Sequence, residues 1–175
     1  MTAFDKLKVL LTEEEIRREV KRLAQEIDRD YRGKHPLLLG ILKGSFVFMA
    51  DLVRLLQTPV EIEFVRLSSY GSARTTSGEI KVVQGLRAQL KGRDILIIED
   101  IVDAGITVGY FLDYLRRRKP ASLKLCALFD KPASRKVSVP IDYLGFTIPD
   151  KFVVGYGLDY DEKFRHLPQL YFIED

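Results

Sequence analysis

Three carboxylates, a glycine and a hydroxyl stand close together near the middle of the chain. Residues 95 to 98 are apolar, and Glu99, Asp100, Asp103, Gly105 and Thr107 follow within nine positions. A permissive glycine and the free amides of a helix N-terminus together form an anion site, most often for phosphate. Two adjacent carboxylates suit ribose hydroxyls or hydrated Mg²⁺. The segment therefore predicts a binding site for phosphate and ribose.

Two familiar nucleotide motifs are missing from the chain. It has neither the Gly-x-Gly-x-x-Gly of dinucleotide binders nor the Gly-Lys-Ser/Thr ending of the Walker loop. The alternative interpretation of residues 95 to 107 is an ordinary strand-to-helix turn with solvated acids. The convergence of three acids, a glycine and a threonine after a buried strand favours the binding site.

The residues around this segment indicate the fold that must position it. The apolar run at 95 to 98 is typical of a strand buried on both faces, followed by a charged turn and a helix start, and such strands belong to parallel sheets covered by helices. Ligands in these sheets bind at the carboxyl ends of the strands. We expect an α/β fold with a mainly parallel sheet. The other predicted strands are 37–42, 60–67, 80–83, 123–129, 143–146 and 152–156, the helices are 12 to about 30, 46–56 and 107–115, and 68–79 is a long loop.

The composition describes one domain, residues 1–175, with a full core. No apolar stretch approaches the ~20 residues of a membrane helix, and the N-terminus lacks the pattern of a secretory signal, so we expect a cytoplasmic protein without a membrane partner. The single cysteine, Cys126, lies in an apolar run and is expected to be a buried thiol. The basic run at 116–119 precedes a proline and suits the end of a helix better than a nucleic-acid site.

The sequence Glu-Asp-Ile-Val-Asp-Ala-Gly-Ile-Thr at 99–107 resembles the phosphoribosyl-pyrophosphate (PRPP) signature of type I phosphoribosyltransferases, in the form found in the hypoxanthine-guanine family. Residues 42–45 resemble the family's pyrophosphate loop, Ser69-Tyr70 its mobile-loop pair, and residues 150–160 its purine-binding stretch. The resemblance runs in order from about Leu39 to Arg165. It implies a mainly parallel twisted sheet flanked by helices, a small hood subdomain, a mobile active-site loop, and a homodimer or homotetramer.

The resemblance also implies an activity in purine salvage. This is the Mg²⁺-dependent transfer of the 5-phosphoribosyl group from PRPP to hypoxanthine or guanine, giving IMP or GMP and pyrophosphate. Transfer to xanthine or another base is an alternative. A regulatory protein on the same fold, which senses PRPP or nucleotides and binds nucleic acid, is another. The chain has no spare length for a DNA-binding domain, so we favour the enzyme and expect no nucleic-acid partner.

The resemblance assigns roles to the residues around the PRPP site. Glu99 and Asp100 bind the ribose hydroxyls, and Mg²⁺ is held by these two carboxylates with Asp159. Asp103 is the catalytic residue, a general base or acid at the purine imidazole ring. A cis peptide is expected between Lys43 and Gly44, where glycine crowds it least. The full PRPP and phosphate set is Lys43, Gly44, Glu99, Asp100, Asp103, Ala104, Gly105, Ile106, Thr107 and Arg165.

The purine site is also assigned by the resemblance. Lys131 donates to the 6-oxo group, which explains the choice of 6-oxopurines over adenine. Phe152 stacks on the base, and Val153 and Asp159 read its edge. Ser69 and Tyr70 belong to the mobile loop, which keeps water away from the reaction. Ala104 and Ile106 depart from some members, which have a hydroxyl and a lysine or other polar residue there, so we expect only backbone contacts from them.

Overall fold

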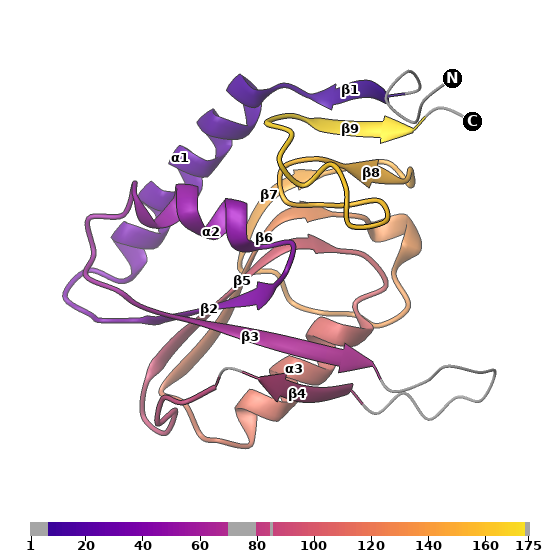
Figure 1. Ribbon diagram of the computed structural model, residues 1–175. Coiled ribbons are helices and arrows are strands. Elements are labelled where there is room, and N and C mark those ends of the chain that lie inside the picture. Colours follow the sequence, from indigo (N-terminus) through magenta and orange to yellow (C-terminus); the bar gives the residue numbers. More distant parts are fainter. Residues whose placement is uncertain (1–6, 70–79, 85, 174–175) are drawn as a thin grey trace.

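Among the described residues, the main sheet has six strands in the order β4-β3-β2-β5-β6-β7 (Figure 1). The computed structural model describes residues 7–69, 80–84 and 86–173. Strands β3, β2, β5, β6 and β7 are mutually parallel, and β4 is antiparallel to β3 at the edge. The predicted mainly parallel sheet is confirmed. The strands are β2 (Leu37–Leu42), β3 (Glu61–Ser69), β4 (Ile80–Gln84), β5 (Asp94–Val102), β6 (Ser122–Asp130) and β7 (Tyr143–Thr147).

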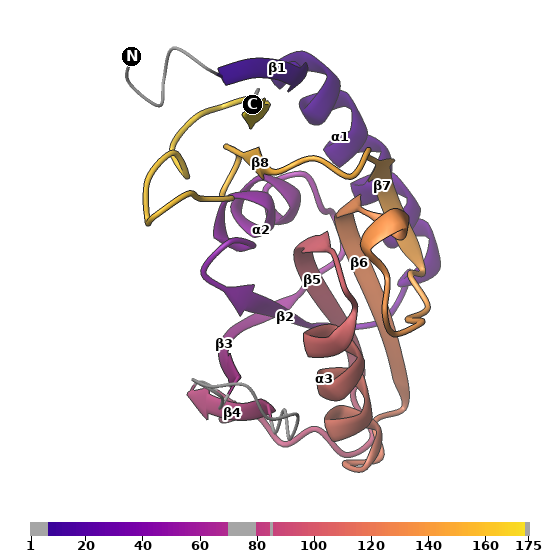
Figure 2. The same cartoon turned by 90° about the vertical axis from the view of Figure 1, so that its right-hand side faces the viewer.

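Helices cover both faces of this sheet (Figure 2). Helices α1 (Glu13–Asp30) and α2 (Phe46–Val53) pack on one face, and α3 (Ile106–Arg116) packs on the other. Strand β5 contributes to both layers because successive side chains point to opposite faces. Leu96 and Ile98 lie in the core with α1 and α2, whereas Ile95 and Ile97 lie in the core with α3. Cys126 is fully buried, as predicted.

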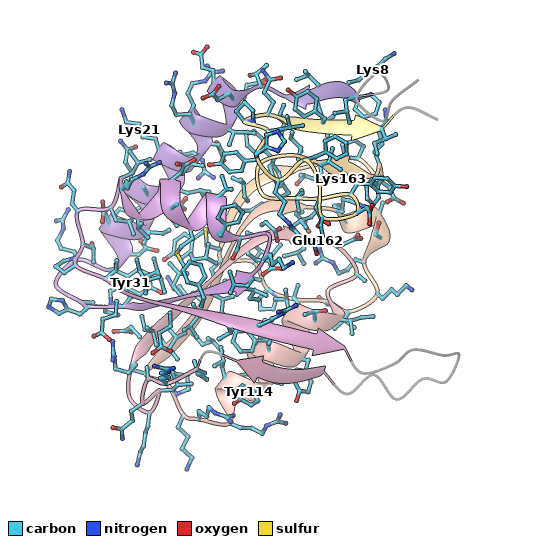
Figure 3. The ribbon with its side chains drawn as sticks, in the orientation of Figure 1. Lys8, Lys21, Tyr31, Tyr114, Glu162 and Lys163 are labelled. Atoms are coloured by element: carbon cyan, nitrogen blue, oxygen red, sulfur yellow. The ribbon has the colours of Figure 1, made fainter. Side chains whose placement is uncertain are left out.

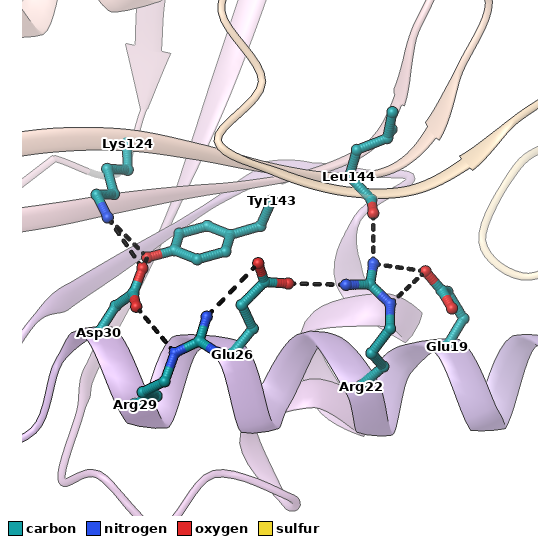
Figure 4. A network of polar contacts seen from close by, with 8 residues as sticks. All are labelled: Glu19, Arg22, Glu26, Arg29, Asp30, Lys124, Tyr143 and Leu144. Carbon is teal, nitrogen blue, oxygen red and sulfur yellow. Dashed lines mark hydrogen bonds and ion pairs between the residues drawn. The ribbon is translucent and has the colours of Figure 1, made fainter.

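Helix α1 begins at the capping box that the sequence predicts. The Thr12 hydroxyl accepts from the Glu15 amide, and the Glu15 carboxylate accepts from the Thr12 amide at 2.8 Å. Polar contacts then fix the helix to the edge of the sheet (Figure 4). Arg22 donates to the Leu144 carbonyl at 2.6 Å, and Asp30 accepts from the Tyr143 hydroxyl at 2.9 Å. These bonds join α1 to β7 in addition to the apolar core.

A second, three-stranded antiparallel sheet lies above the main one (Figure 1) and consists of β1 (Leu7–Leu11), β9 (Leu170–Ile173) and β8 (Val153–Val154). It corresponds to the expected hood. Strands β1 and β9 were not predicted, because each is short and lacks a decisive alternation. Strand β8 is shorter than the predicted strand at 152–156, because Gly155, Tyr156 and Gly157 have φ of 95°, 47° and 97°, which ends the strand.

Other boundaries also differ from expectation. Helix α2 ends at Val53 rather than at residue 56, because the Asp28 carboxylate accepts from the amides of Gln57 and Thr58 and draws the chain out of the helix. A short 3₁₀ turn at Pro132–Ser134 was not predicted. Of the expected loop at 68–79, residues 70–79, including Tyr70, lie outside the described residues, and Ser69 ends β3.

No helix in the described part of the chain is long and apolar enough to cross a membrane.

Candidate active site

A cavity of about 840 Å³ opens at the carboxyl ends of the parallel strands. Its walls come from the loop after β2, the end of β5 with the start of α3, the segment after β6, and the segment between β8 and β9. Eleven of the predicted site residues lie together in its lining: Lys43, Gly44, Glu99, Asp100, Asp103, Ala104, Gly105, Ile106, Thr107, Asp159 and Arg165. These residues span more than a hundred positions of sequence, and the topology of the sheet brings them together.

Glu99 and Asp100 are buried members of β5, which extends past the apolar run into the segment expected to be a charged turn. The strand continues to Val102 because its pairing with β6 extends that far. Glu99 is 9% exposed and Asp100 7% exposed, so the alternative of solvated acids is wrong. Burial raises the pKa of Asp100 to about 6. Burial and the neighbouring Asp100 charge raise the pKa of Glu99 well above its ordinary value.

This buried pair is suited to a hydroxyl-bearing or cationic ligand. Oε2 of Glu99 is buried and has no hydrogen-bond partner within the described chain. A buried carboxylate oxygen without a partner carries a free-energy cost, which a ligand hydroxyl or a metal ion would relieve. No three His, Cys, Asp or Glu side chains in the described ranges are grouped as a complete metal site. Mg²⁺ commonly takes only one or two carboxylates, with water and substrate phosphates, so Glu99 and Asp100 fit it.

The turn after β5 offers backbone amides to the cavity. Gly105 has φ of 79°, a conformation that favours glycine, and α3 begins at Ile106 without a side-chain cap. The first amides of a helix have no partner within the helix, and the residues that carry them here line the cavity. The predicted anion site would use these amides.

Hydrogen bonds from the segment after β6 fix the same turn. Arg135 donates to the carbonyls of Asp103 at 2.9 Å and Val102 at 3.1 Å, and it pairs with Asp130. The amides of Lys136 and Val137 both donate to the Ala104 carbonyl at 3.0 Å. These bonds fix the backbone from 102 to 104, so the amides that follow are preorganised.

The loop after β2 packs directly against the carboxylate pair. Its cis peptide lies between Leu42 and Lys43, one residue earlier than expected. Gly44 is required for a different reason from the predicted one. A Cβ atom at this position would collide with the Asp100 carboxylate, and a Cβ atom at Gly157 would collide with the Gly44 carbonyl. The loop, β5 and the segment after β8 thus meet without room for side chains.

Two cations, Lys43 and Arg165, line the cavity and lie near the same carboxylate, that of Glu162. The Lys43 ammonium lies 2.7 Å from the Glu162 carboxylate, and Arg165 lies 2.7 Å from the Asp159 carboxylate. Arg165 also donates to the Gly157 carbonyl at 2.8 Å and lies 3.5 Å from Glu162. Asp159 is therefore engaged by Arg165 and is not grouped with Glu99 and Asp100.

Of the residues predicted for the purine, Asp159 lines the cavity, whereas Lys131, Phe152 and Val153 lie outside its lining. Lys131 is 8% exposed, and its ammonium lies 3.4 Å from Asp103 and 3.5 Å from Asp150. A hydrogen bond from Ser134 and the charge of Lys131 lower the pKa of Asp150. Phe152 is 54% exposed, with its ring 5.6 Å from Tyr160 in an edge-on arrangement. Val153 is buried in β8.

Sequence reasoning missed several residues of this site. Ser134 and Lys136 line the cavity, and Arg135 supports it. A usable signal was present, since residues 131–136 follow a buried strand that adjoins β5 and so reach the same edge of the sheet. Glu162 had no such signal, because 119 positions separate it from Lys43.

Comparison with known proteins now identifies the family. Residues 7–161 match the family model described as the phosphoribosyl transferase domain. The chain is 47% identical over 170 residues to the hypoxanthine-guanine phosphoribosyltransferase of Bacillus subtilis (strain 168), which covers 97% of this chain and 94% of that protein. The chain belongs to the hypoxanthine-guanine phosphoribosyltransferase family.

Other members of the family agree with this assignment. The crystal structure of a hypoxanthine phosphoribosyltransferase from Staphylococcus aureus superimposes with a TM-score of 0.93 at 41% identity, covering 98% of this phosphoribosyltransferase and 94% of that chain. The bifunctional protein TilS/HprT of Listeria innocua is 47% identical over 163 residues, which are 93% of this chain. The chain spans 25% of that larger protein.

Proposed function

We propose that this phosphoribosyltransferase transfers the 5-phosphoribosyl group from PRPP to hypoxanthine or guanine in purine salvage, giving IMP or GMP and pyrophosphate. One observation carries the proposal. A buried carboxylate pair, Glu99 and Asp100, lies in one cavity with the uncapped N-terminus of α3 and two cations, Lys43 and Arg165. Hydroxyls, a phosphate and a diphosphate are the groups that these three features would bind, and PRPP contains all of them.

Each feature has a chemical role in this reaction. Glu99 and Asp100 would accept hydrogen bonds from the ribose hydroxyls and orient the sugar. The amides from Asp103 to Thr107, with the Thr107 hydroxyl, would hold the 5-phosphate, and Ala104 and Ile106 would contribute through their backbone. Gly44 lets the loop after β2, which would bind the diphosphate, lie close to Asp100. The substrate would thus extend along the cavity, from the helix terminus to the cations.

Departure of pyrophosphate leaves positive charge on the anomeric carbon and negative charge on the leaving group. Glu99 and Asp100 would hold Mg²⁺, which would neutralise charge on the diphosphate. Asp159 would become a further ligand only after leaving its ion pair with Arg165. Lys43 and Arg165 would stabilise the same negative charge. The Ser69 and Tyr70 pair would exclude water from the reacting carbon.

Asp103 would act as the general base or acid at the purine imidazole ring. Its side chain is 52% exposed, and the ammonium of Lys131 lies within 3.4 Å of it. Lys131 would donate to the purine 6-oxo group, a hydrogen bond that the amino group of adenine does not accept. Phe152 would stack on the base, and Val153 and Asp159 would bind its edge. The exposed face of Phe152 supports that role.

An assay of nucleotide formation tests the proposal. We expect IMP and GMP to form from PRPP and the matching base only when Mg²⁺ is present. Hypoxanthine, guanine, xanthine, adenine and uracil are compared at equal concentration. Exclusive transfer to xanthine, adenine or uracil would contradict the assignment of the base, and no transfer to any base would contradict the activity.

We further propose that residues 1–175 form a single domain acting in the cytoplasm as a homodimer or homotetramer. Leu170 of β9 and Val153 of β8 lie in the same core as α1 and α2, which supports one folding unit. Phe46 and Leu55 are 43% and 42% exposed beside a second cavity of about 700 Å³, which supports a subunit contact. Light scattering after size-exclusion chromatography measures the oligomer; a monomer at micromolar concentration would contradict it.

A further inference from the structure

A tight turn between β8 and β9 carries a carboxylate toward the cations of the candidate active site; Figure 3 labels Glu162 and Lys163 on this segment. Tyr160 and Lys163 exchange backbone hydrogen bonds of 3.1 and 3.0 Å. Between them, Asp161 and Glu162 have φ of 53° and 59°. Both central residues of this two-residue turn are therefore left-handed, a conformation that favours glycine or asparagine. Strained residues of this kind gather at functional sites.

The side chain of Glu162 lies between two cations. Its Oε2 atom is 2.7 Å from the Lys43 ammonium and 3.5 Å from Nη2 of Arg165. The hydrogen bond from Lys43 lowers the pKa of Glu162, so the carboxylate is charged at neutral pH. The backbone amide of Glu162 donates to Asp159 at 2.9 Å, which fixes the turn that presents the side chain. One carboxylate oxygen thus bridges both cations.

Lys43 and Arg165 are the cations that the proposed function assigns to pyrophosphate, and the inference rests on that function. A phosphoryl oxygen that binds both cations needs the position that Oε2 of Glu162 takes. Glu162 is 64% exposed and Lys43 48% exposed, so burial fixes neither side chain in this pair. An incoming diphosphate would therefore exchange with a carboxylate of the same charge sign.

We propose that Glu162 is a positioning residue for the diphosphate group. It holds Lys43 and Arg165 in place before substrate binds, and it competes with the diphosphate for them. Competition of this kind weakens the binding of the diphosphate and favours its release as product. Removal of the Glu162 charge is then expected to tighten diphosphate binding rather than to weaken it.

The chain provides a matched control in the same turn. Asp161 has the same charge and a similar φ, and its carboxylate pairs with Lys163 at 3.3 Å rather than with Lys43 or Arg165. Asp161→Asn and Glu162→Gln change the net charge equally. Glu162→Gly also removes the carboxylate, and glycine adopts the positive φ without strain. This variant therefore tests the proposal if Glu162→Gln fails to fold.

The experiment is calorimetric titration of the whole chain with inorganic pyrophosphate in the presence of Mg²⁺. We expect the dissociation constant to fall about 3- to 10-fold in both Glu162 variants, a range set by the modest strength of exposed ion pairs. Asp161→Asn should remain within about twofold of the unmodified chain on the same scale. Titration with GMP, which has no diphosphate, should give similar constants for all four proteins.

Two results would overturn the inference. One is a dissociation constant for pyrophosphate that is equal in the Glu162 and Asp161 variants, and the other is weaker binding in the Glu162 variants. If the unmodified chain forms IMP from PRPP while either result is observed, only the role of Glu162 fails. If the unmodified chain neither binds pyrophosphate nor forms a nucleotide from PRPP, the proposed function fails with it.

Discussion

The ammonium of Lys131 lies 3.4 Å from Asp103 and bridges it to Asp150, 3.5 Å away on the other side. This single buried cation connects the proposed proton-transfer residue at the end of β5 with the beginning of the proposed purine-binding stretch. A base that bonds to Lys131 would therefore lie within reach of Asp103. One ion pair thus joins the proposed proton-transfer group, Asp103, to the group proposed to select the base, Lys131.

Asp103→Asn is expected to lower kcat by about 100-fold or more, because an amide cannot take up or deliver the proton. The affinity for PRPP should change little, since the backbone of residues 103–107 provides the proposed phosphate contacts. Steady-state kinetics with varied PRPP and hypoxanthine separate the two effects. Near-normal turnover would reject the role of Asp103 as a general base or acid.

Lys131→Gln is expected to relax discrimination against adenine, because the neutral amide can both donate and accept a hydrogen bond. The ratio of kcat/KM for hypoxanthine to that for adenine should fall by about tenfold or more, as one lost charged hydrogen bond permits. Lys163→Gln, which removes the same charge from an exposed side chain paired with Asp161, is the control. An unchanged ratio in the Lys131 variant would remove this lysine from base selection.

Gly44→Ala is expected to reduce kcat/KM for PRPP by about 100-fold, because the added methyl group forces the loop after β2 away from Asp100. Gly33→Ala is a suitable comparison. Its φ of 73° also disfavours alanine, but no atom lies within 4 Å of the position of the new Cβ. We expect Gly33→Ala to lower the melting temperature without lowering kcat/KM. Equal kinetic losses in both variants would contradict the importance of the contact between Gly44 and Asp100.

Asp100→Asn is expected to stabilise the ligand-free protein at alkaline pH while lowering activity. The folded-state pKa of about 6 lies above the value of about 4 in an unfolded chain. The folded protein therefore binds more protons between these values, and its stability falls as the pH rises from about 4 to about 6. Since one pKa unit corresponds to about 1.4 kcal/mol, the variant should gain about 2 to 3 kcal/mol at pH 8 and nothing near pH 4.

Urea unfolding at several pH values measures this difference. Asp113→Asn is the matched control, because Asp113 is exposed and pairs with Arg116 only one helical turn away. We expect its effect on the free energy of unfolding to stay below about 1 kcal/mol at every pH. A stability gain for Asp100→Asn that does not grow between pH 4 and pH 8 would show that burial of its charge carries no cost.

The segment from β5 to the start of α3 shows how much of the site can be predicted from the sequence alone. Local rules predict the apolar run of β5, the turn at Gly105 and the helix start after it. These features indicate a phosphate and ribose site without comparison to any related protein. The burial of Glu99 and Asp100 does not follow, because it depends on how far β5 pairs with β6. The roles of Lys131 and Phe152 came only from the resemblance, since neither residue stands in a locally distinctive pattern.

Long-range geometry accounts for most of the remainder. The contact of Lys43 with Glu162 joins residues 119 positions apart, and the pairing of β1 with β9 joins the two ends of the described chain. Neither relation leaves a periodic signal in the residues themselves. The predicted position of the cis peptide was wrong by one residue. Glycine is required at position 44 because the backbone there lies too close to Asp100 for a Cβ atom.

The pairing of β1 with β9 has a mechanical consequence. Leu7, at the start of β1, is opposite Ile173, at the end of β9. The two chain ends therefore leave this strand pair side by side, at the same end of it. Antiparallel hydrogen bonds run perpendicular to the strands. A force that pulls these two ends apart would therefore break the hydrogen bonds between β1 and β9 one pair at a time, starting from Leu7 and Ile173. Loss of β9 would free β8 and the proposed purine-binding stretch next to it, whereas β5, which pairs with β2 and β6 in the other sheet, would keep its hydrogen bonds.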